Sequence, residues 1–126
     1  MAIKFTDNAA TTLYVGIGAT DTLLQVAPNK GDNFYALTGG SGDYTVITLE
    51  DESGNREFIR VDHRPVGSDV LGSVGYPCTR GYWGSTARAW SASTTIVDCR
   101  PAAGAFNELV AGVLDEETAF INSILF

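Results

Sequence analysis

The sequence predicts a mainly β protein, a small β-barrel or sandwich followed by a C-terminal helical arm. Short β-branched and aromatic runs alternate with turn residues over most of the chain. After Pro101 the apolar residues change to a helical spacing. The 126 residues suffice for one domain with a modest core and an added arm. We therefore expect a β-barrel or sandwich domain over residues 1–100 and a helical arm over residues 101–126.

The clearest unit is a β-hairpin. Residues 44–50 and 57–62 are rich in β-branched and aromatic side chains, and Ser-Gly-Asn at 53–55 supplies the positive-φ positions of a turn. Strands so short and closely spaced favour a small barrel or sandwich over an open sheet with helical crossovers. Further short strands are predicted at 22–26, 33–37, 70–71, 74–76 and 94–99, with the glycine-rich residues 72–84 as connecting segments.

The arm carries an apolar stripe at helical spacing, and Asp115 can cap a second helical stretch, so one helix or two both fit the pattern. The stripe either folds back on its own domain or packs against a neighbouring subunit. We favour the neighbouring subunit because a β domain of this size leaves little uncovered surface. The residues expected at this interface are Phe106, Leu109, Val110, Val113, Phe120, Ile121 and Ile124.

Composition excludes several classes of function. With 15 acidic and 8 basic residues the formal charge is −7, which argues against nucleic acid and an anionic membrane as partners. The N-terminus lacks a signal-peptide pattern, and the sequence has no apolar run of about 18 residues, so we expect a chain made and kept in a cytosol.

Residues that carry catalysis or bind metal are scarce. His63 is the only histidine, and no Gly-x-Ser-x-Gly motif accompanies it. Cys78 and Cys99 form no Cys-x-x-Cys motif; we expect buried or half-buried thiols, because a reducing cytosol disfavours a disulfide. The glycine pairs do not match a phosphate-binding loop. We expect no enzyme activity, no cofactor and no metal site.

One segment stands out as a candidate interface. Residues 79–90 hold two tryptophans, one tyrosine and two arginines, the side chains that dominate protein–protein hot spots. A second interpretation places Tyr82 and Trp90 in the core, with Arg80 tethering the loop by hydrogen bonds. The candidate interface residues are Arg80, Tyr82, Trp83, Arg88 and Trp90.

Several short motifs, taken in order, resemble a small β-module of tailed-bacteriophage virion proteins. They are Ala10-Thr11-Thr12-Leu13, Ala19-Thr20-Asp21-Thr22-Leu23-Leu24-Gln25-Val26, Phe34-Tyr35-Ala36-Leu37, Asn55-Arg56-Glu57-Phe58-Ile59-Arg60-Val61, Thr79-Arg80-Gly81 continuing through Gly84-Ser85-Thr86-Ala87-Arg88-Ala89-Trp90, and Ala103-Gly104-Ala105-Phe106-Asn107-Glu108-Leu109. The chain departs from that module at Tyr82-Trp83, where glutamine is usual, at Ser85, where threonine is usual, and in a longer 63–77 connection.

The resemblance implies a non-enzymatic virion structural protein, assembled in the cytoplasm of the bacterial host. Its partners would be copies of itself in a symmetric oligomer and other virion proteins, such as tail, baseplate, neck or fibre parts. Two alternatives stay open. One is a capsid decoration (cement) protein, and the other is a receptor- or carbohydrate-binding module that uses Tyr82, Trp83 and Trp90 as a stacking face.

Overall fold

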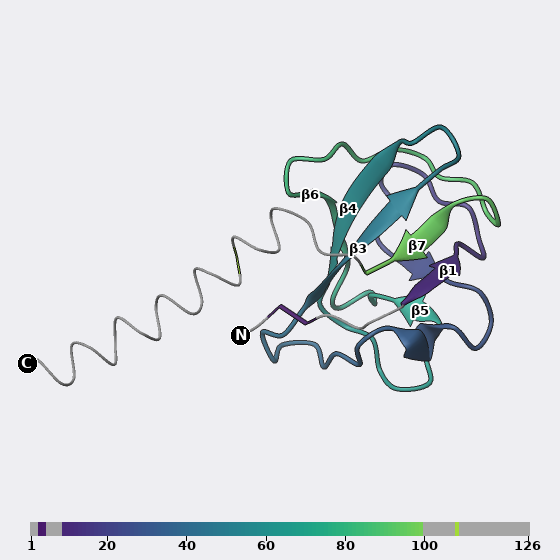
Figure 1. The fold of residues 1–126 in the computed structure, drawn as a ribbon. Helices are drawn as coiled ribbons and strands as arrows, with labels where there is room; N and C mark the ends of the chain where they lie inside the picture. The colour runs from purple at the N-terminus through teal and green to yellow at the C-terminus, as the bar shows by residue number, and fades with distance from the viewer. Residues whose placement is uncertain (1–2, 5–8, 100–107, 109–126) are drawn as a thin grey trace, which may run out of the picture.

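The computed structural model describes residues 3–4, 9–99 and Glu108, and this part of the chain is mainly β (Figure 1). A five-stranded antiparallel sheet has the order β1-β7-β3-β4-β6, and β2 pairs with β5 in a two-stranded sheet. The elements are β1 (Ala10–Thr12), β2 (Leu24–Gln25), the 3₁₀ turn η1 (Gly31–Asn33), β3 (Thr45–Glu50), β4 (Arg56–Val61), β5 (Val70–Leu71), β6 (Thr79–Tyr82) and β7 (Ile96–Asp98).

The mainly β class is thereby confirmed. The predicted helical arm, with the interface residues assigned to it, lies outside the described residues except for Glu108, whose backbone is helical. None of the described helical segments is long and apolar enough to cross a membrane.

The predicted hairpin is present as β3 and β4, which pair in continuous register from Thr45 opposite Val61 to Glu50 opposite Arg56. Its turn is closed by Asp51, whose carboxylate accepts hydrogen bonds from the backbone N–H groups of Ser53 and Asn55. The local sequence therefore determines both the strands and the turn of this unit.

Two predicted strands, at 33–37 and 74–76, are wrong. The buried guanidinium of Arg64 donates hydrogen bonds to the carbonyl oxygens of Phe34 (2.8 Å) and Tyr35 (3.3 Å), which in a strand would accept from a neighbouring strand. Residues 73–76 instead form a tight turn, because Ser73 and Tyr76 exchange both backbone hydrogen bonds. In these two segments, the hydrogen bonds from the Arg64 side chain and the closure of a tight turn outweigh the strand propensity of the residues.

Two strands were not predicted. β1 is polar and short, so it shows no apolar alternation. β6 lies inside the glycine-rich stretch, and its pairing with β4 shifts register: Phe58 lies opposite Tyr82, but Arg60 lies opposite Thr79. β6 therefore has one extra residue, a β-bulge, and Gly81 takes a φ of +60° there.

The sheet buries apolar side chains on both faces. The main core contains Leu13, Leu24, Val26, Phe34, Leu37, Ile47, Leu49, Ile59, Val61, Leu71, Trp90 and Val97. Both cysteines are free thiols, Cys78 buried and Cys99 half-buried, as predicted; burial raises the pKa of Cys78 to about 12. A smaller cluster on the opposite face of the β3–β4 hairpin joins Ile3, Tyr44 and Val46 to Phe58, Tyr82 and Trp83.

Candidate functional site

The conformation of residues 80–90 depends on one buried carboxylate, that of Glu57 on β4. Its side chain is fully buried and accepts five hydrogen bonds. Arg80 donates from Nε (2.7 Å) and Nη2 (2.9 Å), the backbone N–H groups of Gly81 and Arg88 donate at 2.9 and 3.1 Å, and Trp90 Nε1 donates at 3.0 Å. One side chain thus fixes both ends of the segment.

Burial by itself raises the pKa of Glu57, but the hydrogen bonds from Arg80, Trp90 and Gly81 outweigh it, and the net pKa lies below the ordinary value. A carboxyl group whose pKa is lowered by folding stabilises the protein at pH values above the pKa that the group has in the unfolded chain. This stabilisation is lost as the pH falls through the pKa of the group in the folded protein. Glu57 is therefore ionised in the folded protein at neutral pH.

These hydrogen bonds bury two of the predicted interface residues, Arg80 and Trp90. Trp90 is only 3% exposed, and the Arg80 side chain only 7%. Arg80 also donates from Nη1 to the carbonyl oxygens of Gly18 and Asp21, so it joins the loop to the N-terminal third of the chain. For these two residues the structure matches the second interpretation, a core tryptophan and a tethering arginine. A carbohydrate-stacking face would therefore lack Trp90.

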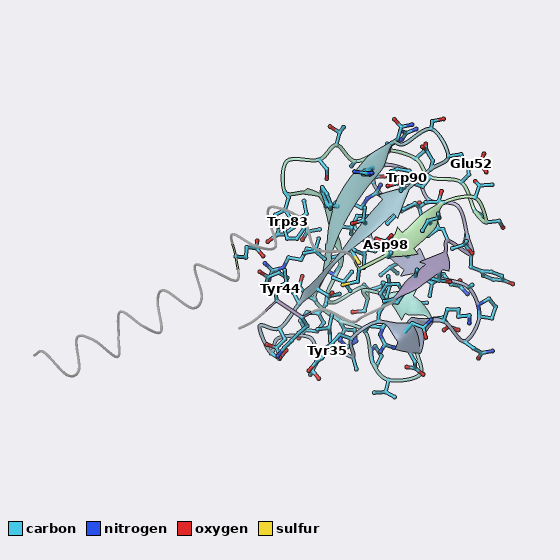
Figure 2. All side chains as sticks on the ribbon, in the orientation of Figure 1. Tyr35, Tyr44, Glu52, Trp83, Trp90 and Asp98 are labelled. Atoms are coloured by element: carbon cyan, nitrogen blue, oxygen red, sulfur yellow. The ribbon has the colours of Figure 1, made fainter. Side chains whose placement is uncertain are left out.

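The other three predicted residues are accessible. Arg88 is 42% exposed, lies over the Trp90 ring at 4.8 Å and pairs weakly with Asp51 at 3.7 Å. Tyr82 and Trp83 are half-buried on the face of the small cluster. Tyr44 and Trp83 lie on the same side of the sheet, away from Trp90 (Figure 2).

The polar tips of three aromatic side chains converge on Glu108. Tyr82 Oη donates to Glu108 Oε1 at 2.9 Å, and Trp83 Nε1 donates to the same oxygen at 3.0 Å. Tyr44 Oη donates to Glu108 Oε2. A residue of the predicted arm is thereby bound to the β domain at the segment that the sequence analysis singled out as an interface.

Arg60 completes this group, which we call the Glu108 site: Tyr44, Arg60, Tyr82 and Trp83. Its guanidinium lies 3.8 Å from the centroid of the Tyr44 ring and is paired with Asp62 at 2.9 Å. Three side chains thus donate hydrogen bonds to the Glu108 carboxylate, and the charge of Arg60, which itself donates to Tyr82 Oη at 3.4 Å, acts on it from nearby.

The pKa values of the partners follow from these contacts. Burial raises the pKa of Glu108, but the hydrogen bonds from Tyr44, Trp83 and Tyr82, with the charge of Arg60, bring it below its ordinary value. The pKa of Tyr44 is raised by burial and by the Glu108 carboxylate. Glu108 is therefore bound as a carboxylate, and Tyr44 stays a hydrogen-bond donor.

The turn after β6 aims the Trp83 indole. Trp83 itself has a φ of +51°, a left-handed conformation that a bulky residue rarely adopts. Ser85 Oγ stabilises the turn, donating to the Tyr82 carbonyl at 2.7 Å and accepting from Phe58 N–H at 3.0 Å. At Gly81 a Cβ atom would lie 2.9 Å from the Ser85 carbonyl oxygen, so only glycine fits there.

Sequence reasoning missed Tyr44, Arg60 and Glu108 as members of the site. The alternation of the hairpin places Val46 opposite Arg60 on one face, and this was the available signal for Arg60. No sequence signal indicated that Glu108, among the acids of the arm, would contact the sheet.

The histidine considered for catalysis makes structural contacts with its neighbours. His63 Nδ1 accepts a hydrogen bond from the Gly39 N–H at 3.0 Å, and its ring lies against Tyr76. Within residues 3–4, 9–99 and 108, no group of three or more His, Cys, Asp or Glu side chains could hold a metal ion. An open hollow of about 370 Å³ is lined by Gly40, Gly42, Asp43, Asp62, Gly75, Tyr76 and Pro77.

No protein family and no curated protein matches the chain. The resemblance to phage virion modules therefore stays a prediction.

We predict that Glu57→Gln destabilises the protein by about 3–5 kcal/mol, because it leaves the buried Arg80 guanidinium without its counter-charge. Urea unfolding, followed by tryptophan fluorescence, measures the loss. Glu52→Gln, at the exposed hairpin turn, is the matched control and should change stability by less than about 0.5 kcal/mol. Equal effects of the two substitutions would contradict the role given to Glu57.

We predict that the indole N–H resonance of Trp83 reports on Glu108. In the native chain it should shift as the pH falls below the ordinary glutamate pKa of about 4.3, because the lowered pKa keeps the contact intact above that value. Glu108→Gln should shift it at neutral pH and leave the Trp90 resonance in place. Glu116→Gln removes the same charge and serves as control; an equal shift in both variants would refute the contact.

Proposed function

We propose that this chain is a non-enzymatic structural subunit of a bacteriophage particle. It forms a symmetric oligomer and docks tail, baseplate, neck or fibre parts. Assembly uses burial of surface, with about 25 cal/mol gained per Å² of apolar area removed from water. Repetition around the oligomer adds avidity that no single contact supplies.

One observation carries the proposal. The two segments that the sequence analysis assigned to assembly, residues 79–90 and the arm, are joined by hydrogen bonds from Tyr82 and Trp83 to Glu108. Glu108, the described residue of the arm, is therefore bound at the segment whose composition is typical of an interface. In the proposal, the apolar residues of the arm, from Phe106 to Ile124, pack against neighbouring subunits.

The proposal includes a closed β domain, a small barrel or sandwich. Two contacts beyond the named strands support closure. Leu13, just after β1, bridges to Val26, just after β2. The N–H of Gly72, just after β5, donates to the carbonyl of His63, just after β4. The two-stranded sheet is thus hydrogen-bonded to the extension of the edge strand β1 and to that of β4, the neighbour of the other edge strand β6.

The buried Glu57 network supports a scaffold over a catalyst. Glu57, the most deeply buried carboxylate in the part of the chain that the structure describes, has all its hydrogen bonds directed to Arg80, Trp90 and the backbone, so it has no free oxygen facing solvent. The acidic chain suits docking on basic surfaces of other virion proteins and repels packaged DNA.

Antibody-gold labelling of intact particles of the source phage, read by electron microscopy, tests the location. Label at the tail end, neck or fibres is the expected result. Label spread over the head would instead establish a capsid decoration protein, and unlabelled particles would overturn the virion assignment. Particles treated without the first antibody are the control.

Light scattering tests the role of the arm. The full chain should have the mass of an oligomer. A chain ending at Ala103 should form an assembly with fewer subunits, because it lacks Glu108 and the apolar stripe. Circular dichroism of both chains checks that the β domain is retained. An unchanged oligomeric mass would show that the arm does not drive assembly.

A further inference from the structure

The donors of the Glu108 site are held in place by the β domain itself. Tyr82 lies on β6, opposite Phe58 of β4. Trp83 is oriented by the turn that Ser85 closes, and Gly81 at its start is bound to the buried Glu57 carboxylate. None of these constraints involves Glu108. The binding geometry for a carboxylate is therefore preformed, which lowers the entropy cost of binding.

The other half of the site is fixed in the same way. Tyr44 directly precedes β3, and its carbonyl accepts a hydrogen bond from the N–H of Lys4 at 2.7 Å. The Arg60 guanidinium is held between the Tyr44 ring and the Asp62 carboxylate. The Tyr44 hydroxyl and the Arg60 charge are thus positioned by residues of the domain.

The site forms hydrogen bonds only with the carboxylate group of the glutamate. All the hydrogen bonds described for Glu108 end on its two carboxylate oxygens. A site that reads only a carboxylate does not depend on which chain carries it. The same donors would bind a glutamate presented by another molecule, provided that molecule places it there.

The character of the site fits a partner as acidic as this chain. Because Arg60 is already paired with Asp62, the site binds through three neutral donors more than through net positive charge. Hydrogen bonds from neutral donors are screened little by salt. Two copies, each with a formal charge of −7, can therefore use this contact without an oppositely charged surface.

We propose that the Glu108 site is the acceptor of a contact between subunits, and that in the oligomer it binds the Glu108 carboxylate of a second copy of this chain. The proposal rests on the oligomer proposed above and names the contact through which its arms are exchanged. Each copy then gives one glutamate and receives one, so the contact repeats around a closed ring or across a twofold axis.

Mixed oligomers of full-length chains test the exchange. The acceptor chain carries Glu108→Gln and is labelled with ¹⁵N, so its site keeps all its donors but has no carboxylate of its own. The unlabelled donor chain carries Tyr82→Phe and Trp83→Phe, so its own site keeps only the Tyr44 hydroxyl as a donor to Glu108, while the acceptor chain offers all three donors. The matched control is the donor chain with Glu108→Gln added. The chains are mixed in denaturant and refolded together.

The readout is the Trp83 indole N–H resonance of the labelled chain. We expect the donor chain to move it toward its position in the native protein, in proportion to the amount added, and the control chain to leave it in place. Equal spectra with donor and control would overturn the exchange. The amide spectrum of the labelled chain shows whether it is folded; if the donor chain does not fold, Tyr44→Phe replaces its two substitutions.

Light scattering of the native chain separates the two proposals. An oligomeric mass with no effect of the donor chain means that Glu108 stays in its own subunit, which overturns the exchange and leaves the proposed function standing. A monomeric mass overturns the oligomer and the exchange together. An oligomeric mass with a donor-specific shift supports both.

Discussion

The ion pair between Glu57 and Arg80 is the interaction on which the rest of the site depends. Glu57 has no contact with solvent, so its charge is stable only because Arg80, Trp90 and two backbone N–H groups surround it. The same bonds hold residues 80–90 against β4. The conformation of a long glycine-containing segment is thereby fixed by polar contacts within the core instead of by a regular ladder.

The buried Glu57–Arg80 pair also determines the conformation of the Glu108 site at the surface. Gly81, bound to Glu57, begins the turn that places Trp83 in a left-handed conformation, and the indole of Trp83 then faces Glu108. The buried pair and the surface site are thus two ends of one short segment. Loss of order at Glu57 would be felt at Glu108 although the two carboxylates lie on opposite faces of the sheet.

Local patterning predicted the hairpin because its strands and its turn are determined by neighbouring residues. It failed where side chains distant in sequence determine the backbone conformation. Arg64 donates hydrogen bonds to the carbonyl oxygens of residues 34 and 35, and Glu57 accepts hydrogen bonds from a segment whose sequence is typical of a loop. Composition selected residues 79–90 as a candidate interface, but it could not separate the inward Arg80 and Trp90 from the half-buried Trp83 on the opposite face. That separation comes from strand pairing, which a single sequence does not encode locally.

The bulge in β6 sets which face of the sheet each side chain of residues 79–82 occupies. In a regular strand Thr79 and Tyr82, three residues apart, would face opposite sides, and Tyr82 would turn toward the core and away from Phe58, its partner across the sheet. The extra residue lets Arg80 reach Glu57 on one face while Tyr82, two residues later, reaches Glu108 on the other. The neighbouring turn at 73–76, which closes on itself, is where evolution can lengthen the chain at little cost.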